Sequence, residues 1–436
     1  MHRYERQLVA VGLFFILTVL PVATFAENMP PGEENSPKVL SLQDAITRIK
    51  ESPSLKAASQ YVDIQDGLVE QAGLLPNPDI AFEVENFGGK DELDGFESAE
   101  ATLAVSQLLE LGGKRSARSN IATYEKSLVE NDFQIESQGL LLETMEAFYA
   151  LLAAQERFNQ AKQLIGLAEQ SYKTVADRVE AGKVSPIQEL QARVELNLVR
   201  NAWEASQRQL VQARQYLSSL WGAPKPDFDV VVGDFEDLHE PPTWEELQVL
   251  FPDNPELKRW DTELASKKAN LELERANGVS DLTLSFGVRN YQETDDYAFV
   301  AGIEFPLPLF DRNQGSKKAA QSEVYQSTYQ RDAAVAKLES NLQSAYQELL
   351  STFHQARTIK QDIMPAAENA NEAAQTGYQE GKFDFLVALD AQRTLFEVKG
   401  QYIDAFSSYH EARLNVMKLV GSTILNQPSA RFTNAD

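Results

Sequence analysis

The sequence predicts a mainly α-helical protein with a small β part, built from two copies of one helix–β-hairpin–long helix–helix unit. Three observations lead to this fold class. The two halves share identities at an offset of 199 residues, no proline occurs between Pro78 and Pro186, and four short segments alternate apolar and polar residues. Alternation with period two predicts strands, whereas a long proline-free segment rich in Ala, Glu, Gln and Leu favours helix.

The composition argues against several classes of protein. The 436 residues include 40 Lys and Arg, 65 Asp and Glu, and no cysteine, for a net charge of −25. Without cysteine there is no disulfide scaffold, thiolate metal site or cysteine nucleophile. The acidic balance argues against a nucleic-acid partner, because phosphate neutralisation needs clustered Lys and Arg. A hydrophobic content of 43% is too high for a disordered acidic chain, so we expect a folded protein.

Residues 1–26 have the pattern of a secretory signal peptide. Arg3 and Arg6 precede an apolar run from Leu8 to Leu20, and Thr24 and Ala26 are small residues where a signal peptidase cleaves. The run of about 13 residues is short for a membrane span, which needs about 20. No later segment is apolar over about 18 residues, so we expect no transmembrane helix. Export to the periplasm or the outer membrane is therefore expected.

The repeat at offset 199 defines the domain organisation. Residues 27–222 are expected to form the first unit and residues 243–422 the second, joined by a connector at 223–242 and followed by a polar tail at 423–436. Chance would give two or three identities over this stretch, and ten are found. The identities are Gly182/Gly381, Lys183/Lys382, Leu190/Leu389, Ala192/Ala391, Leu196/Leu395, Val199/Val398, Ala213/Ala412, Arg214/Arg413, Leu220/Leu419 and Gly222/Gly421.

The elements are expected in the same order in each unit. In the first, strands at 79–88 and 98–108 precede a long helix at 114–181 and a tip at 182–185. In the second, strands at 281–291 and 297–308 precede a long helix at 314–380 and a tip at 381–384. At 1.5 Å per residue the first long helix would extend about 100 Å. Gly166 and Pro365 occupy equivalent positions at offset 199, and we expect both long helices to bend there.

The four strand segments have the length and pattern of membrane strands. Each covers about 9–11 residues, enough for a tilted strand to cross a bilayer. Isolated amphipathic hairpins more often pack on a soluble core, but these occur twice, follow a signal peptide and carry acidic tips at 88–97 and 293–296. Four strands cannot close a barrel, and hydrocarbon forbids open sheet edges. Membrane insertion therefore requires several chains to share one barrel, with cyclic symmetry.

Several motifs carry a resemblance to a known family. Leu75-Pro-Asn-Pro-Asp79, Glu83-Val-Glu-Asn-Phe-Gly-Gly89 and Ser106-Gln-Leu-Leu-Glu-Leu-Gly-Gly-Lys-Arg115 resemble signatures of the TolC-like outer membrane efflux factors, specifically their cation-efflux, CzcC-like branch. Residues 377–384 resemble the second periplasmic tip of this family, and residues 306–310 resemble the exit from its fourth strand. The resemblance covers nearly the whole mature chain, including the duplication.

The resemblance implies a homotrimer that forms a 12-stranded outer membrane β-barrel on a periplasmic α-helical barrel. Such a trimer would be the exit duct of a tripartite efflux pump that exports heavy-metal cations from a Gram-negative bacterium. Its partners would be a periplasmic adaptor (membrane fusion) protein, an inner-membrane resistance-nodulation-division pump and outer membrane lipid. Two alternatives stay open: the same duct exporting drugs, other small molecules or a polypeptide, and a periplasmic coiled-coil adaptor or scaffold.

The resemblance also suggests roles for the tips and for two acidic residues above them. The tips would contact the adaptor through Gly182, Lys183, Val184, Ser185, Gly381, Lys382, Phe383 and Asp384. Glu368 and Glu372 lie one helical turn apart and are candidates for a gate at the periplasmic entrance. The plain interpretations are an αα-hairpin turn with a C-cap glycine and a solvated helix face.

The strand pattern adds candidates for the barrel. If the apolar residues face lipid, the lumen would be lined by Glu83, Glu85, Arg289 and Glu304. An aromatic girdle could be formed by Phe87, Phe96, Tyr291 and Tyr297, although strand propensity alone also explains aromatic residues there.

Motifs for metal binding and catalysis are absent from the sequence. The histidines after the signal segment, His239, His354 and His410, are far apart and have no second histidine at helical spacing. Gly112-Gly-Lys114 lacks the first glycine of a phosphate loop, and no Gly-x-Ser-x-Gly elbow occurs. We therefore expect no cofactor, no bound metal and no enzyme activity.

Overall fold

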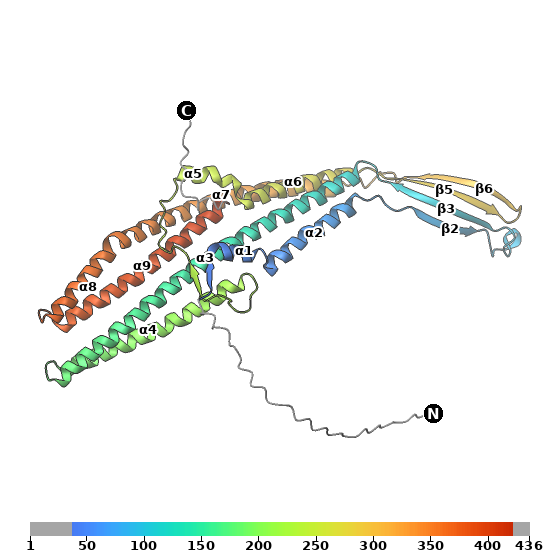
Figure 1. Cartoon of the computed structure of the whole chain (residues 1–436). Helices are drawn as coiled ribbons and strands as arrows, with labels where there is room; N and C mark the ends of the chain where they lie inside the picture. Colours follow the sequence, from blue (N-terminus) through green and yellow to red (C-terminus); the bar gives the residue numbers. More distant parts are fainter. Residues whose placement is uncertain (1–36, 422–436) are drawn as a thin grey trace, which may run out of the picture. The chain divides into compact units, whose positions relative to one another are not determined.

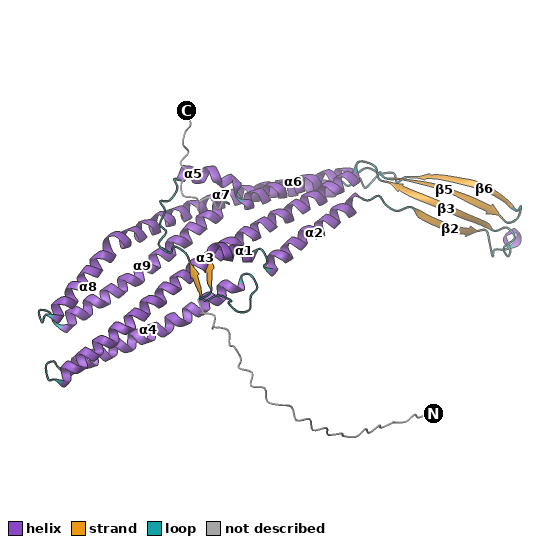
Figure 2. Ribbon diagram, viewed as in Figure 1, coloured by secondary structure: helices purple, strands orange, loops and turns teal. Residues whose placement is uncertain are grey.

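The computed structural model describes residues 37–421, so the signal peptide predicted at 1–26 and the tail predicted at 423–436 lie outside the described residues. Within them the chain is mostly helical, with one four-stranded and one two-stranded sheet (Figures 1 and 2). The predicted fold class, mainly α with a small β part, is confirmed at this level.

The first half begins with a short strand and ends with a long helical hairpin. Its elements are β1 (Val39–Ser41), α1 (Leu42–Ile49), α2 (Pro53–Gly73), β2 (Asp79–Glu85), β3 (Glu100–Leu109), α3 (Lys114–Glu180) and α4 (Pro186–Ser219). The connector contributes β4 (Val230–Val232). The second half comprises α5 (Trp244–Leu250), α6 (Pro255–Ala276), β5 (Leu282–Tyr291), β6 (Asp296–Glu304), α7 (Gln314–Thr358), a π-helical turn (Ile359–Ile363), α8 (Met364–Gln379) and α9 (Phe385–Val420).

The first helix of each half begins with the same chemistry. The Ser41 hydroxyl accepts the amide N–H of Asp44, and the Asp44 carboxylate accepts the amide of Ser41 in return. Thr243 and Glu246 repeat this reciprocal pair at the start of α5. Such capping boxes satisfy amide groups that have no partner inside the helix. The two halves therefore share local signals that fall outside the identities at offset 199.

The long helices of the two halves differ in continuity. α3 runs for 67 residues through Gly166 without interruption, so the structure has no break at this position. The equivalent helix of the second half is divided by the π-helical turn just before Pro365. Proline lacks the amide N–H that the helix would use and its ring crowds the preceding turn, whereas glycine keeps its N–H. The helical hydrogen-bond pattern is therefore interrupted in the second half only, and the expected bend at Gly166 stays a prediction.

The strand bounds differ from the prediction where the backbone leaves the extended region. β2 ends at Glu85 rather than 88, because Asn86 and Gly88 have φ angles of 57° and 68°. β6 covers Asp296–Glu304 rather than 297–308, since Pro306 and Pro308 cannot donate ladder hydrogen bonds. β3 (Glu100–Leu109) and β5 (Leu282–Tyr291) lie within two residues of the expected 98–108 and 281–291.

Glycine at position 112 is required where the sheet meets the helices. Its φ is +71°, and a Cβ there would lie 2.8 Å from the Val279 Cβ. Gly113 follows with φ +78° and forms the N-terminal cap of α3. The next residue, Lys114, pairs with Asp281 at 2.8 Å and so joins α3 to the start of β5. The motif that resembled a family signature therefore has a local physical reason.

The connector is part of the core. β4 pairs in parallel with β1, and the Gln155 side chain on α3 both donates to and accepts from the backbone of Val231. Phe235 lies buried with Phe406 of α9 in the largest hydrophobic cluster. Sequence reasoning missed β1 and β4, because three-residue strands are too short to show an alternating pattern.

His410 is buried where α9 meets the connector. Its Nε2 lies 2.8 Å from the carbonyl oxygen of Phe235, and its ring stacks on Tyr149 with centroids 4.0 Å apart. Burial lowers the pKa of the His410 imidazole below its usual value, and the Arg413 guanidinium lowers it further. The neutral imidazole donates from Nε2, because the Phe235 carbonyl can only accept.

No helix in the described part of the chain combines the length and the apolar character needed to cross a membrane.

We predict that His410 makes the folded protein less stable in mild acid. The unfolded chain binds a proton at this imidazole more readily than the folded chain, so stability falls as the pH drops below about 6.5. Thermal unfolding of the purified full chain, measured from about pH 8 to about pH 5, should show a smaller acid-induced loss for His410→Gln than for the wild type. His354→Gln, at an exposed position, should keep the wild-type pH dependence. Parallel pH profiles for the wild type and His410→Gln would contradict the prediction.

Candidate functional site

The four-stranded sheet has one apolar and one polar face. Its strand order is β2-β3-β5-β6, all pairs antiparallel. The register aligns Phe82 with Leu103, Val288 and Phe299, and it aligns Glu83 with Thr102, Arg289 and Ala298. Phe82 and Phe299 are 71% and 70% exposed, whereas Thr102 is buried. One face of this sheet thus consists of exposed apolar side chains, the reverse of a soluble hairpin that packs its apolar face on a core.

All four lumen candidates lie on the polar face. Glu83 and Arg289 share one row of paired residues, Glu85 lies on the next row of that face, and Glu304 pairs with Thr283 on the same side. Six carboxylates are in register on this face against one guanidinium: Asp79, Glu83, Glu85, Glu100, Asp296 and Glu304. The polar face is therefore strongly acidic.

Arg289 organises the end of this face nearest the hairpin loops. Its guanidinium contacts Glu85 at 2.9 Å and Glu100 at 2.8 Å, and its Nε donates to the Thr102 hydroxyl at 2.9 Å. One cation on β5 thereby bridges two carboxylates on β2 and β3. Without it the two carboxylates would face each other on neighbouring strands uncompensated.

The four aromatic candidates do not lie on one face of the sheet. Tyr297 lies on the apolar face beside Phe299, and Phe87 stacks on Phe96 with ring centroids 5.4 Å apart in the β2–β3 loop. Tyr291 pairs with Glu100 and Asp296 and therefore belongs to the polar face. The expectation that Tyr291 joins a girdle with Tyr297 is wrong, because Tyr291 lies on the polar face and Tyr297 lies on the apolar face.

The two tips have the same backbone hydrogen bonds, shifted by 199 residues. Lys183 donates to Arg178, and Lys382 donates to Gly377. Gly182 and Gly381 donate to Val179 and Tyr378 and have φ angles of 67° and 74°. This is the glycine-terminated C-cap that closes a helix before the chain reverses. The tips of the two units are therefore structurally equivalent.

The second tip differs from the first by an aromatic residue. The Phe383 ring packs on Gly377, where a Cβ would lie 2.2 Å from a ring carbon, yet the residue is 47% exposed. Phe385 points inward and is buried with Val175, Ala192 and Leu389 of both helical hairpins. Arg178 lies over the Tyr378 ring, 4.9 Å from its centroid. The two tips are thus held against each other, with one half-exposed aromatic residue at the end.

The gate candidates are both exposed on α8, one turn apart. Glu368 lines a polar cavity of about 570 Å³ between α3, the connector, α8 and α9, together with Glu156, Glu236, Lys360 and Lys399; Glu372 does not. The structure places both side chains on one helix face but brings only Glu368 beside other charged groups. The polar cavity is a feature that sequence reasoning missed, because its residues come from four distant segments.

Charges in the polar cavity are unequally compensated. Lys360 pairs with Glu236 at 2.9 Å. Burial alone would raise the pKa of Glu236, but hydrogen bonds from Lys360 and Tyr402 hold this pKa below its usual value. Burial, with the nearby Glu236 charge, raises the pKa of Glu156. The connector is therefore fixed by an ion pair at the level of the π-helical turn.

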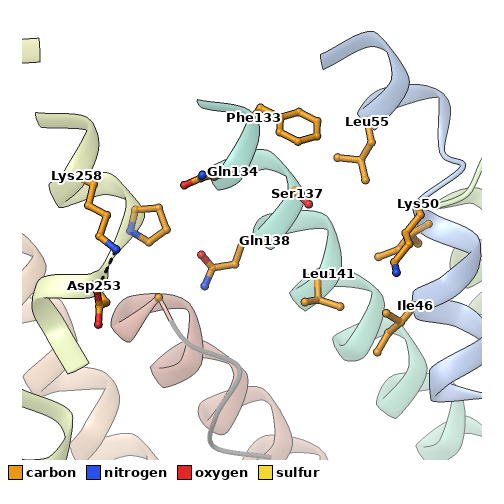
Figure 3. Close-up of a pocket in the computed structure, with 13 residues that line it drawn as sticks. Ile46, Lys50, Leu55, Phe133, Gln134, Ser137, Gln138, Leu141, Asp253 and Lys258 are labelled. Atoms are coloured by element: carbon orange, nitrogen blue, oxygen red, sulfur yellow. Dashed lines mark hydrogen bonds and ion pairs between the residues drawn. The ribbon is translucent and has the colours of Figure 1, made fainter. Parts of the chain in front are cut away.

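A second cavity of about 470 Å³ lies among α1, α2, α3 and the start of α6 (Figure 3). Its lining combines apolar side chains such as Ile46 and Leu141 with the Lys258–Asp253 ion pair, which has an N···O distance of 3.0 Å. These groups include no nucleophile paired with a base. Across residues 37–421, no three His, Asp or Glu residues form a group suited to a metal ion.

Comparison with known proteins identifies the family. The family model described as "Outer membrane efflux protein" matches residues 47–223 and 247–422. The chain belongs to this family. This outer membrane efflux protein is 32% identical over 369 residues to the cobalt-zinc-cadmium resistance protein CzcC of Cupriavidus metallidurans, covering 84% of the chain and 86% of the relative. It is 26% identical over 325 residues to the nickel and cobalt resistance protein CnrC of that species, covering 74% of each.

Solved structures of outer membrane channels share the fold. The structure of CusC, described in connection with transmembrane channel formation, matches with a TM-score of 0.73 and covers 87% of this chain and 92% of its own. At 18% sequence identity, this likeness concerns the fold alone. The predicted resemblance to TolC-like efflux factors and their CzcC-like branch is confirmed, and the family is one of efflux channels rather than enzymes.

We predict that Arg289→Gln destabilises the sheet by about 1–2 kcal/mol, less than a fully buried pair would cost because the Arg289 side chain is partly exposed. The substitution leaves Glu85 and Glu100 uncompensated, and the triple variant with Glu85→Gln and Glu100→Gln should recover most of the loss. Thermal loss of β-sheet circular dichroism in detergent would measure both. Arg115→Gln, at an exposed position, should have no effect, and a triple variant less stable than the single variant would contradict the prediction.

Proposed function

We propose that the protein is the outer membrane exit duct of a tripartite efflux system. The observation that carries this proposal is the inverted four-stranded sheet, apolar outside and acidic on the other face. Water disfavours such a sheet, whereas a bilayer around the apolar face and water along the acidic face suit it. In this arrangement Glu83, Glu85, Arg289 and Glu304 line the lumen.

The sheet edges support a homotrimer. Within the described residues, β2 and β6 each pair on one side only, so both edges present unpaired backbone groups. In hydrocarbon each unpaired group costs several kcal/mol, and only closure with other chains removes both edges. Three chains supply twelve strands, an even number within the range of known barrels. Eight is the lower end of that range, so two chains would be the smallest alternative.

Exposed stripes on the helices also support association between copies. On α4, the apolar residues Ile187, Leu190, Val194 and Leu198 are exposed at helical spacing. On α2, Tyr61, Ile64 and Leu68 form a similar stripe. Such stripes are typical of helices that pack on a neighbour, and packing copies side by side would produce the periplasmic α-helical barrel.

The cargo we propose is heavy-metal cations. Two relatives, CzcC and CnrC, are named as resistance proteins for cobalt, zinc and cadmium and for nickel and cobalt. An acidic lumen favours cations over anions along the whole wall without binding any one of them tightly. The duct would then perform no chemistry and need no cofactor, and the choice of metal would be made by the inner-membrane pump.

The tips are the proposed contact with the periplasmic adaptor. Gly182, Lys183, Val184 and Ser185 on one tip and Gly381, Lys382, Phe383 and Asp384 on the other end the two helical hairpins. Phe383 is the aromatic residue exposed there, and exposed aromatic residues often anchor protein interfaces. Glu368 and Glu372 on α8 would form an acidic gate where copies converge near the entrance.

We predict that deleting the gene lowers resistance to heavy-metal cations but not to organic solvents or antibiotics. Growth across zinc, cobalt, cadmium, nickel, copper and silver, with a plasmid copy as the control, would measure this. Sensitivity to solvents or antibiotics alone would indicate that the same duct exports these compounds rather than metal cations. Recovery of the protein in the soluble periplasmic fraction, without a heat-modifiable band, would instead support a coiled-coil scaffold.

We predict that Phe383→Asp abolishes metal resistance while the protein still forms oligomers in the outer membrane. The charge would remove an apolar contact worth about 2 kcal/mol or more at an interface centre. Resistance and the oligomer band on native gels would be measured together. Val249→Asp, at an exposed position of α5, is the matched control and should keep resistance. Wild-type resistance in Phe383→Asp would overturn the assignment of the tip.

A further inference from the structure

An apolar segment continues the outer face of the sheet beyond its last strand. Tyr297, Phe299 and Ile303 lie on the apolar face of β6, and Phe305 and Leu307 follow at the same two-residue spacing. Phe310 is 91% exposed, and Phe305, Leu307 and Leu309 are also exposed. This segment lies between the sheet and α7, on the side away from the hairpin loops. The apolar surface therefore extends past the end of β6 toward the helices.

Part of the backbone of this segment either lacks a donor or has a partner within the chain. Pro306 and Pro308 carry no amide N–H. The amide of Leu309 donates to the carbonyl of Leu307 at 2.8 Å, and the carbonyl of Phe310 accepts from the Gln314 side chain at 3.1 Å. The cost of moving a backbone from water into an apolar medium comes from unpaired groups. These features reduce the number of unpaired backbone groups that the segment would bring to a lipid boundary.

Two cations flank the segment. The Arg312 Nε donates to the carbonyl of Pro308 at 3.1 Å, which holds the guanidinium against the apolar segment. Lys318 is exposed one turn into α7. Among residues 37–421, neither side chain forms an ion pair with a carboxylate, although the chain has 65 acidic residues. Phosphate groups complement such cations beside an apolar surface.

We propose that residues 305–310, together with Arg312 and Lys318, bind the phospholipid leaflet at the base of the sheet. The apolar side chains enter the edge of the acyl region, and the two cations contact headgroup phosphates. This inference rests on the proposed membrane insertion of the sheet and adds a lipid-binding anchor at its helical end. Continuity with the apolar face favours lipid over a second copy of the chain, because a protein interface would have to bury both cations.

Spin labelling can place the segment, because the chain contains no cysteine. Phe310→Cys, Phe82→Cys and Val249→Cys would be labelled in the full-length protein, reconstituted in vesicles of phosphatidylethanolamine and phosphatidylglycerol. Oxygen concentrates in hydrocarbon, and a nickel chelate stays in water. We expect high oxygen access at Phe82, high chelate access at Val249, and intermediate access to both at Phe310.

The outcomes separate the anchor from the proposed function. A label at Phe310 that matches Val249, with Phe82 in lipid, overturns the anchor and leaves the membrane sheet standing. A label at Phe310 that is immobile and reached by neither reagent overturns the anchor in favour of contact between copies. A label at Phe82 in water overturns the membrane sheet and the anchor together.

The proposed contact of Arg312 and Lys318 with headgroup phosphates can be tested separately. Phosphatidylglycerol binding to the detergent-purified protein would be measured by native mass spectrometry for Arg312→Gln/Lys318→Gln and for the control Arg208→Gln/Lys225→Gln. Affinity should fall about fivefold for each cation removed at the anchor and stay unchanged in the control. Unchanged affinity overturns the phosphate contact. Displacement of the lipid by inorganic phosphate would overturn the leaflet in favour of a free anion.

Discussion

Every other feature of the sheet depends on the pairing of its backbone groups. Two hairpins from distant parts of the sequence meet through β3 and β5, which leaves β2 and β6 each with one edge unpaired within residues 37–421. Water can satisfy such edges, but hydrocarbon cannot. In the proposed duct the apolar face meets lipid, and the two edges then require neighbouring chains. Under this proposal, membrane insertion and oligomerisation follow from the same constraint on backbone pairing.

The helical part meets a different requirement, which is to keep two long hairpins in register. The connector lies buried between them, fixed by Gln155 on α3 and by Phe235 against α9. At the far end, Phe385 is buried with residues of both hairpins. The duplicated units are therefore joined at two levels, near the connector and at the tips.

Much of this arrangement follows from local sequence. Strand alternation located four strands to within a few residues, and the glycines of the tips located the chain reversals because only a C-cap needs φ > 0 there. Face assignment was less complete. The aromatic residues were grouped by their nearness to the strand ends, although alternation already places Tyr291 with Arg289 on the polar face and Tyr297 with Phe299 on the apolar face. The buried connector and the polar cavity around Glu236 arise from contacts between distant segments, which have no local pattern.

The π-helical turn distinguishes the two long helical segments of the chain, α3 in the first half and α7–α8 in the second. α3 has helical hydrogen bonding over 67 residues without interruption. A sideways force at its tip is therefore expected to move the whole helix. Between α7 and α8 the backbone changes its hydrogen-bonding pattern at Ile359–Ile363, and Pro365 removes one donor. A force applied at both tips is therefore expected to tilt α3 as a whole and to bend the second segment between α7 and α8. Although the halves are related in sequence, their long helices are expected to respond differently to the same force.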